Sequence, residues 1–281
     1  MSVFTLSSIL LAAFLHAMWN TIAKKNKNKR QAILAVVLGH VPFALITIPF
    51  AKLPTLESIP YIVVGALLHV GYQLSLSSAY QHGDLSTVYP ISRGSAPVLA
   101  AIILFFLWDE SLTKEQLIAM LTICIGVFSF AFVGNKAGKI NKDGIRFSLL
   151  TATFIASYSV IDGMGARIAE TSLGFYIYLT LLNAILMLGV NRFHERTSLR
   201  KILFDQKLAF WLGGGASFFA YALVTWGFTQ APIALVAAIR ETSIIIALFF
   251  GTFFLNEKIQ IKQILSTMIT LSGVILLRLS K

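Results

Sequence analysis

The chain has 281 residues, of which 57% are hydrophobic and only 12% charged, and its formal net charge is +11. A soluble domain of this size carries roughly 25% charged residues, so the composition excludes an ordinary soluble protein and places the chain in lipid. The basic residues lie between apolar runs, where they orient helices against a membrane, so we do not interpret the positive charge as a sign of nucleic-acid binding.

Ten apolar segments are long enough to cross a bilayer, which takes about 20 residues in helical form. We expect helices because they satisfy their own backbone hydrogen bonds in lipid. In chain order the segments cover residues 3–23, 31–51, 58–80, 86–108, 116–134, 146–166, 173–191, 208–228, 231–254 and 260–279. The first lacks a basic start, so we interpret it as a retained helix and not as a cleaved signal peptide. Short polar linkers make neighbouring helices antiparallel.

Lysine and arginine are unevenly divided between the two sets of linkers. The linkers after the first, third, fifth, seventh and ninth helices carry 16 of these residues, whereas the opposite face, with both chain ends, carries 5. The positive-inside rule therefore predicts that the first set of linkers is cytoplasmic and that both termini lie outside. The predicted location is the cytoplasmic (inner or plasma) membrane, which the chain crosses many times.

The second half of the sequence repeats the first. Residues 93–127 align with residues 240–274 without a gap, at a shift of 147. The aligned pairs include Arg93 with Arg240, Glu110 with Glu257, Gln116 with Gln263 and Gly126 with Gly273. The predicted units are residues 1–135, a basic connecting loop at 136–145, and residues 146–281. Five helices per unit is an odd number, so the second unit is inverted relative to the first, and a binding site is expected near the midplane between them.

These residues and their surroundings resemble a known family. The chain is similar to the EamA-type transporters of the drug/metabolite transporter superfamily in four short motifs. They are His16-Ala17-Met18-Trp19-Asn20, the run from Tyr89 to Pro97, Tyr158-Ser159-Val160-Ile161-Asp162-Gly163 and Arg240-Glu241-Thr242-Ser243. The resemblance covers nearly the whole chain, and it implies ten helices in two inverted repeats around a central cavity. Relatives are usually drawn with cytoplasmic termini, whereas the count of basic residues here predicts the reverse.

Polar and charged residues inside the predicted helices are the candidates for a substrate site. A charged side chain at mid-membrane costs at least ~2.5–3.5 kcal/mol, so it needs a partner, a water-filled cavity or a function. Helical spacing places several of them on common faces. We expect ten to converge on one chamber: His16, Trp19, Asn20, Gln73, Tyr89, Arg93, Tyr158, Asp162, Arg240 and Glu241.

For these residues a structural role competes with a functional one. Arg93 and Arg240 are predicted either to attract a carboxylate or phosphate, or to form an ion pair in which Arg240 is neutralised by Asp162 or Glu241. The two carboxylates are also candidates for proton coupling, since burial favours their protonated form. For the polar stripes, including the His69 and Gln73 face, the competing role is interhelical hydrogen bonding.

No catalytic motif is present in the sequence. There is no Walker loop and no Gly-x-Ser-x-Gly elbow, and His194-Glu195 lacks the second histidine of a zinc-protease helix. The single cysteine, Cys124, provides neither a disulfide nor a metal framework. We therefore expect no enzyme activity, no cofactor and no metal. The expected function is secondary transport or export of a small polar metabolite, such as an amino acid or small organic ion, by alternating access around the central cavity.

Two other classes of function remain as alternatives: a membrane enzyme or lipid scramblase, and a non-transporting membrane assembly partner. The expected partners are a small-molecule substrate and the lipid bilayer. Proton coupling and a homodimer are left open, and nucleic acid is not expected.

Overall fold

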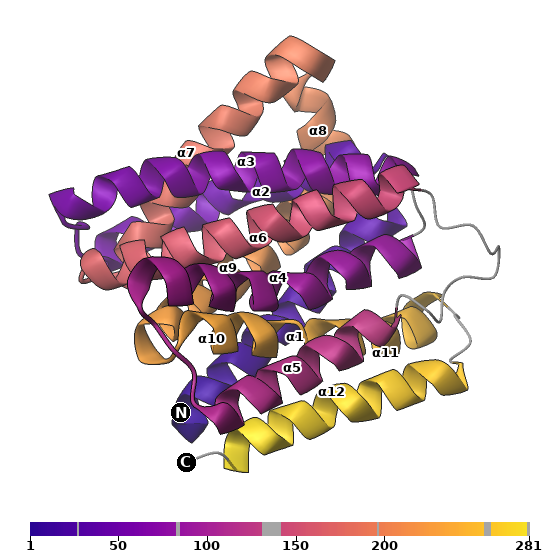
Figure 1. Cartoon of the computed structure of the whole chain (residues 1–281). Helices are drawn as coiled ribbons and strands as arrows, with labels where there is room; N and C mark the ends of the chain where they lie inside the picture. Colours follow the sequence, from indigo (N-terminus) through magenta and orange to yellow (C-terminus); the bar gives the residue numbers. More distant parts are fainter. Residues whose placement is uncertain (27, 83–84, 131–141, 196, 256–259, 280–281) are drawn as a thin grey trace.

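A computed structural model describes residues 1–26, 28–82, 85–130, 142–195, 197–255 and 260–279, and in that part every regular element is a helix. Figure 1 shows long helices that run roughly side by side, with both chain termini at the same end of the bundle. An even number of crossings is needed to bring both termini to one end, in agreement with the ten helices expected from the sequence.

The first half consists of five long helices. They are α1 (Val3–Lys25), α2 (Lys29–Thr47), α3 (Ile59–His82), α4 (Leu85–Trp108) and α5 (Lys114–Ser129), with 3-10 turns at Ile48–Phe50 and Leu56–Ser58. Local sequence determines where several of them begin. The Thr113 hydroxyl accepts from the Gln116 backbone N–H and the Gln116 side chain accepts from the Thr113 N–H, which forms a capping box at the start of α5.

The second half repeats this plan with interruptions. Its helices are α6 (Lys142–Ile168), α7 (Ser172–Val190), α8 (Leu199–Asp205), α9 (Gly214–Gln230), α10 (Ile233–Arg240), α11 (Ser243–Leu255) and α12 (Ile261–Leu279). π-helical turns at Asn191–Glu195 and Ala209–Gly213 follow α7 and precede α9. The short helix α8 lies in a segment that the sequence predicted as a linker.

The predicted ninth helix is divided in two, which corrects the continuous helix expected over 231–254. Between α10 and α11 the backbone N–H of Thr242 donates to Ile239 at 3.0 Å, and that of Ile245 donates to Thr242 at 2.9 Å. These are i→i−3 bonds, tighter than those of an α-helix, and such a 3-10 stretch within a helix often marks a hinge. The break falls at Glu241, so the charged residues themselves lie at the interruption.

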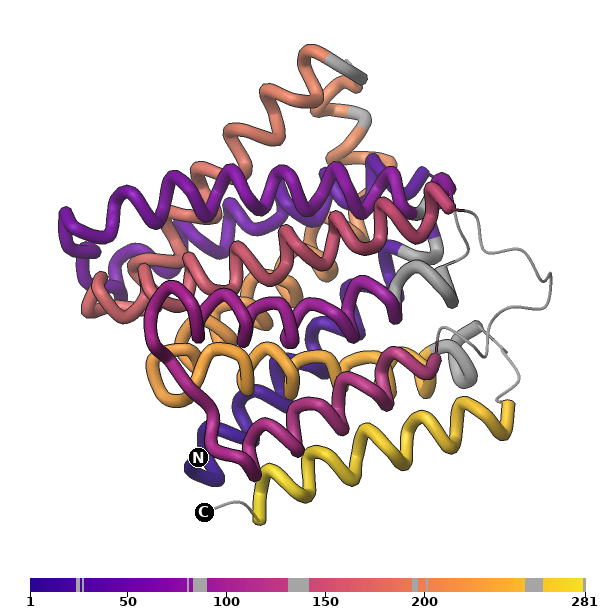
Figure 2. The backbone as a smooth tube through the Cα atoms, in the orientation of Figure 1, coloured from indigo at the N-terminus to yellow at the C-terminus, as the bar shows by residue number. Residues whose placement is uncertain are grey.

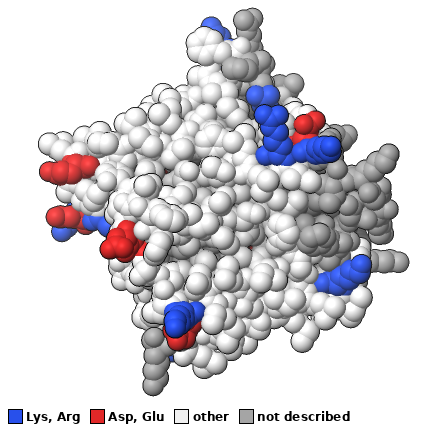
Figure 3. Space-filling model, in the orientation of Figure 1, with Lys and Arg blue, Asp and Glu red and all other residues white. Residues whose placement is uncertain are grey.

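Within the described residues, nine segments are long and apolar enough to span a membrane. The tenth helix of the plan is α5, whose 16 described residues fall short of that length. Its exposed apolar side chains, such as Ile118 and Ile125, point away from the bundle as lipid-facing residues do. Charged side chains are confined to the helix ends in Figure 3, and a broad uncharged belt lies between them. The protein is thus an all-α, multi-pass membrane protein of ten helices in two inverted five-helix repeats.

Equivalent helices of the two halves make equivalent contacts. Helix α3 packs on α6 while its counterpart α9 packs on α1, and α3 packs on α7 while α9 packs on α2. Each half therefore completes the other, as two units related by a two-fold axis do. The halves are not separate globules, and their interface contains the centre of the molecule.

The crossing of α5 and α12 repeats this symmetry at residue level. A Cβ on Gly126 would lie 2.6 Å from the Thr270 backbone nitrogen, and one on Gly273 would lie 2.7 Å from the Ile123 nitrogen. At the shift of 147, Gly126 corresponds to Gly273 and Ile123 to Thr270, so the two contacts are mutual images. Figure 2 shows the helices side by side and running in opposite directions, as inversion requires.

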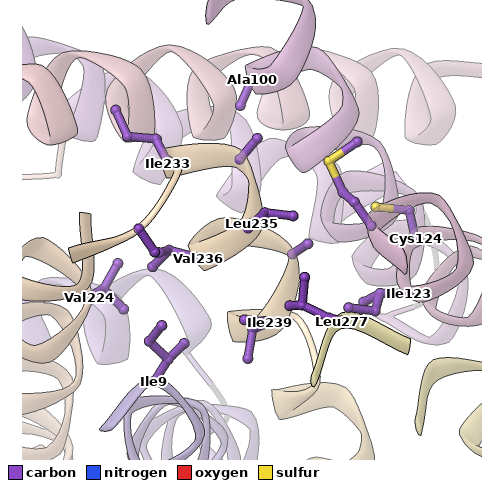
Figure 4. Close-up of a cluster of buried hydrophobic side chains, with 14 of the residues drawn as sticks. Ile9, Ala100, Ile123, Cys124, Val224, Ile233, Leu235, Val236, Ile239 and Leu277 are labelled. Atoms are coloured by element: carbon purple, nitrogen blue, oxygen red, sulfur yellow. The ribbon is translucent and has the colours of Figure 1, made fainter. Parts of the chain in front are cut away.

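Helix α10 lies in the interior, unlike most helices of a membrane protein. Its eight residues are all buried. In Figure 4 its Ile233, Leu235, Val236 and Ile239 are surrounded by apolar side chains from other helices, including Ile9 of α1 and Val224 of α9. This packing on all sides fixes the position of Arg240 at the end of α10.

Candidate functional site

A chamber of about 70 Å³ lies between the two halves. Helices α1, α2 and α3 contribute its walls from the first half, and α6, α7, α9 and α10 contribute from the second. Its polar lining residues are His16, Trp19, His40, His69, Tyr72, Gln73, Tyr158, Tyr176, Thr180, Asn183, Ser217, Tyr221 and Arg240. A water occupies about 30 Å³ of liquid, so the chamber in this conformation accommodates a few waters and not a metabolite.

One wall of the chamber carries a buried cluster of two guanidinium groups and one carboxylate. Arg93 Nη1 lies 3.2 and 3.3 Å from the two Glu241 carboxylate oxygens, and Arg240 Nη2 lies 3.2 Å from Oε1. All three side chains are at most 2% exposed. Because the two guanidinium groups remain charged, the three residues together carry a net charge of +1. Arg93 comes from the first half and the other two from the second, so the cluster also joins the halves.

His16 adds an imidazole to this cluster. Its Nε2 accepts from Arg93, and its Nδ1 lies 3.2 Å from the indole N–H of Trp19. Arg93 and Trp19 are both donors, whereas a neutral imidazole has only one nitrogen that accepts. The tautomer of His16 therefore decides from which of these two donors the ring accepts a hydrogen bond. Trp19 also lines the chamber.

A second buried cluster is built around Asp162 of α6. Its Oδ2 lies 2.8 Å from His69 Nε2 of α3 and accepts from the Tyr221 hydroxyl of α9 at 2.6 Å. The Asp162 side chain is fully buried and that of His69 is 13% exposed. The other oxygen, Oδ1, has no hydrogen-bond partner among the described residues. It lies against Gly65, where an added Cβ would come within 2.4 Å of it.

Tyr158 separates the two clusters. The Arg240 guanidinium carbon lies 5.9 Å from the centre of its ring, and the His69 imidazole stacks on the ring at 4.2 Å. The phenol thus has a cation on one side and an imidazole paired to a carboxylate on the other. This arrangement gives the chamber a positive end and an acidic end, separated by one aromatic ring.

The two ends of the bundle differ in how they close the chamber. A smaller cavity of about 20 Å³ shares Ile33 and Gln73 with the chamber and extends to Arg30 and Asn191, at the end of the bundle opposite the termini. This is the end where the sequence places the basic linker after the first helix. The smaller cavity therefore adjoins the chamber on the side of that end.

A polar clamp closes the other end, beside the chain termini. Glu110, which follows α4, accepts from Arg167 of α6 at 2.6 Å and from the Ile233 backbone N–H at 2.9 Å. Arg167 also donates to the carbonyl oxygens of Phe228 at 2.8 Å and Ala231 at 3.1 Å. Two side chains thus hold the turn between α9 and α10 against the first half. A hollow of about 490 Å³ adjoins Arg167 at this end.

The ten residues predicted from the sequence do not all line the chamber. Five line the chamber: His16, Trp19, Gln73, Tyr158 and Arg240. Arg93, Asp162 and Glu241 lie one step behind, bonded to lining residues or to each other. Asn20 does not line the chamber, because its side chain donates to the His16 carbonyl of its own helix at 2.8 Å. The side chain of Tyr89 lies outside the described part of the structure, as does Glu257, the repeat partner of Glu110.

The predicted pairing of Arg240 is settled in favour of Glu241. Tyr158 lies between Arg240 and the Asp162 cluster, so Asp162 takes His69 as its partner and leaves Glu241 to the two arginines. Gln73 meets the expectation of interhelical bonding as well, since it donates to Asn183 of α7 at 3.1 Å while lining the chamber.

Several lining residues were not among the ten. His40 lies 2.8 Å from the Thr180 hydroxyl and lines the chamber. Tyr176, Asn183 and Tyr221 are isolated polar residues in apolar helices, and no spacing pattern marked them. The signal that was available was their polarity within spanning segments, which in lipid indicates contact with protein or water.

Comparison with known proteins agrees with this architecture. The profile of the EamA-like transporter family matches residues 3–132 and again residues 143–279, once for each half. The chain superposes on a solved crystal structure with a TM-score of 0.76 over 99% of this chain and 97% of the other, at 17% sequence identity. At that identity the likeness concerns the fold. Among curated proteins, none matches the chain significantly. Because the family profile spans nearly all of the sequence, twice in tandem, the chain belongs to the EamA-like transporter family of the drug/metabolite transporter superfamily.

Proposed function

We propose that this protein is a secondary transporter of a small polar metabolite that bears a carboxylate or phosphate group, moved by alternating access through the central chamber. The observation that carries the proposal is the charge cluster at the chamber wall. Two buried guanidinium groups share a single carboxylate, and Arg240 lines the chamber. A buried positive charge in a membrane protein is costly unless it has a function, and an anionic solute beside Arg240 would offset the positive charge of this cluster.

The remaining polar groups of the chamber suit a small zwitterion or polyfunctional anion. Trp19 and Thr180 lie on the walls, and Tyr158 provides an aromatic face beside Arg240. Ligand sites commonly combine a few polar groups with apolar walls, which Ile33, Val36 and Leu179 supply here. The amino acids and small organic ions suggested by the family resemblance belong to this chemical class.

Alternating access is supported by the difference between the two ends. The chamber leads through a smaller cavity to one end, and the Glu110–Arg167 clamp closes the other. The chamber must enlarge to hold a metabolite, so helices must move during transport. The 3-10 break between α10 and α11 and the two prolines within α4, Pro90 and Pro97, are the places where this is easiest, because helical hydrogen bonds are already weakened or missing there. The sequence has no nucleotide-binding motif, so a solute or ion gradient supplies the driving force.

A ligand screen on purified protein tests the proposal. Amino acids, small carboxylates, phosphate esters and organic cations are compared by thermal shift, and a ligand present at 100 times its dissociation constant stabilises the folded state by about 2.7 kcal/mol. We expect anionic or zwitterionic compounds to raise the Tm of the wild type and to have little effect on Arg240→Gln. This variant should fold, because Arg93 still neutralises Glu241.

Transport is then measured with the best ligand in proteoliposomes, as exchange of labelled for unlabelled compound. A ligand that stabilises Arg240→Gln as strongly as the wild type would refute the anion site. Binding without exchange would refute transport. Chemical conversion of the ligand or lipid scrambling in the same vesicles would instead identify one of the two alternative functions, an enzyme or a scramblase.

A further inference from the structure

We propose that Asp162 and His69 form the proton-binding site through which a proton gradient drives the solute, an inference that rests on the proposed transport function. The pair lies in the middle of the molecule between α6 and α3, with Nε2 and Oδ2 2.8 Å apart. His69 reaches the chamber, whereas Asp162 is fully buried behind it. A proton can therefore enter from the chamber at the imidazole and be held on a carboxylate that solvent does not reach.

The unpartnered oxygen of Asp162 is the feature that makes this pair a candidate site for a proton. Oδ2 has two partners, His69 and Tyr221, but Oδ1 has none among the described residues and lies against Gly65. A bare anionic oxygen in such surroundings is unfavourable, and protonation of the carboxyl removes the charge. With neutral His69 and ionised Asp162 the pair carries a charge of −1, and one added proton makes it neutral.

Glu241 is the other buried carboxylate near the chamber, and its partners exclude it from this role. It lies between Arg93 and Arg240, two guanidinium groups that do not release their protons. Protonation of Glu241 would remove the carboxylate charge that both guanidinium groups contact. The partners of Asp162 are an imidazole and a phenol, so its charge can change at a smaller cost.

The surroundings of the pair also provide a coupling mechanism. Tyr158 and Tyr221 flank His69, and His40, Tyr72 and Tyr176 come from the other helices around the chamber. Arg240 carries a charge that lies 5.9 Å from the centre of the same Tyr158 ring on which His69 stacks. Its positive charge opposes a second positive charge on His69. An anionic solute beside Arg240 offsets that charge, so solute binding favours proton binding, and by linkage the proton favours the solute. Solute and proton are therefore expected to move in the same direction.

Infrared difference spectroscopy tests the proton site without a substrate. Purified protein is compared between acidic and neutral pH, and the carbonyl stretch of a protonated carboxylic acid is followed. We expect a band that disappears in Asp162→Asn and persists in Glu57→Gln, a matched change at an exposed carboxylate. Tyr221→Phe removes one hydrogen bond to the same carboxyl without deleting it, so the band should shift in frequency. If Asp162→Asn does not fold, this shift alone assigns the band. A band that neither variant alters would overturn the proposal.

The coupling of solute uptake to the proton gradient is tested in proteoliposomes. The probe is a mixture of the radiolabelled amino acids that occur in proteins. An inward proton gradient should accelerate uptake by the wild type and by His82→Gln, which changes an imidazole of the same helix that does not line the chamber. In His69→Gln the ratio of uptake with the gradient to uptake without it should fall to about one, whatever the absolute rate of exchange of the variant. Equal stimulation of His69→Gln and wild type would overturn the coupling role. A wild type that exchanges none of the probe would count against the proposed substrate class, while the infrared result still decides the proton site.

Discussion

Glu241 determines the charge balance at the centre of the molecule, because two guanidinium groups share its carboxylate. Removal of either arginine leaves a balanced pair, whereas removal of the carboxylate leaves two buried cations. Loss of one partner of a buried ion pair typically costs about 3–5 kcal/mol when the other stays uncompensated. We therefore expect Glu241→Gln to lower the Tm far more than Arg93→Ala, as measured in detergent by tryptophan fluorescence. The double variant Glu241→Gln/Arg93→Ala should recover part of the loss; if it is worse than either single variant, the shared-carboxylate interpretation is wrong.

Arg93 is also the residue for which a structural role and a functional role give different results. If Arg93 only holds α4 against the second half, any substitution that keeps its positive charge should preserve solute exchange. Its guanidinium contacts Glu241 through Nη1 and His16 through Nη2, and an ammonium group cannot reproduce this fork. We expect Arg93→Ala to fold and to lose solute exchange, and Arg93→Lys to restore little of it. Normal exchange by Arg93→Ala would show that this residue takes no part in transport.

At the scale of helices, the crossing of α5 and α12 depends on two glycines. A side chain at Gly126 would meet the backbone of Thr270, which cannot move aside as a flexible side chain can. Overpacking of this kind costs typically 1–3 kcal/mol. Gly126→Val and Gly273→Val should destabilise the protein by similar amounts, since the contacts are symmetric. Gly189→Val in α7 is the matched control, because an added Cβ there has no atom within 4 Å. Thermal unfolding of the three variants provides the comparison, and a control as unstable as the others would contradict it.

The Glu110–Arg167 clamp, at the start of α10, is a second feature at the scale of helices. Glu110 and Arg167 hold the α9–α10 turn closed through bonds to Ile233, Phe228 and Ala231. Alternating access requires these bonds to break when that end opens. We expect Glu110→Gln to speed maleimide labelling of Ile233→Cys and to slow that of Gln73→Cys, both in a Cys124→Ser background. If labelling became faster at both positions, or slower at both, Glu110→Gln would have changed the flexibility of the whole protein. It would not have shifted the protein between a state closed at one end and a state closed at the other. Glu57→Gln serves as the control substitution.

At the scale of the whole molecule, the distribution of charge predicts how the bundle lies in the membrane. Lys29 and Lys114 are both exposed and are the first residues of α2 and α5. Helix α5 begins at the end of the bundle that holds the chain termini, and α2 begins at the opposite end (Figure 1). The 16-to-5 excess of basic residues predicts that Lys29 is cytoplasmic. With Cys124→Ser as background, an impermeant thiol reagent should label Lys114→Cys in intact cells and label Lys29→Cys only after lysis. The opposite pattern would place the termini in the cytoplasm, as in the usual drawing of the family.

The orientation also decides which side the chamber leads to. The small cavity near Arg30 and Asn191 lies at the basic end. If that end is cytoplasmic, the conformation described here is closed towards the outside by the Glu110–Arg167 clamp and nearest to opening towards the cytoplasm. The labelling experiment therefore fixes the state as well as the topology.

The class of protein, the number of helices and their inverted repetition could all be predicted from the amino-acid sequence. Long apolar runs have only one low-energy form in lipid, and the Arg93/Arg240 and Gly126/Gly273 correspondences record a duplication. It also identified His16, Trp19, Gln73, Tyr158 and Arg240 as chamber residues, because polar groups in lipid must face protein or water.

The pairing of those groups could not be predicted, because it depends on contacts between helices. Three of these contacts join residues 57–148 positions apart: Glu241 with Arg93, Asp162 with His69, and Glu110 with Arg167. Asp162 also meets Tyr221, and Glu241 contacts its neighbour Arg240. The boundaries predicted at 135/136 and 145/146 stay a prediction, since residues 131–141 lie outside the described part. Helical periodicity specifies which face of a helix a residue occupies, but not which helix packs against that face. Partner choice is set by the packing of the whole bundle.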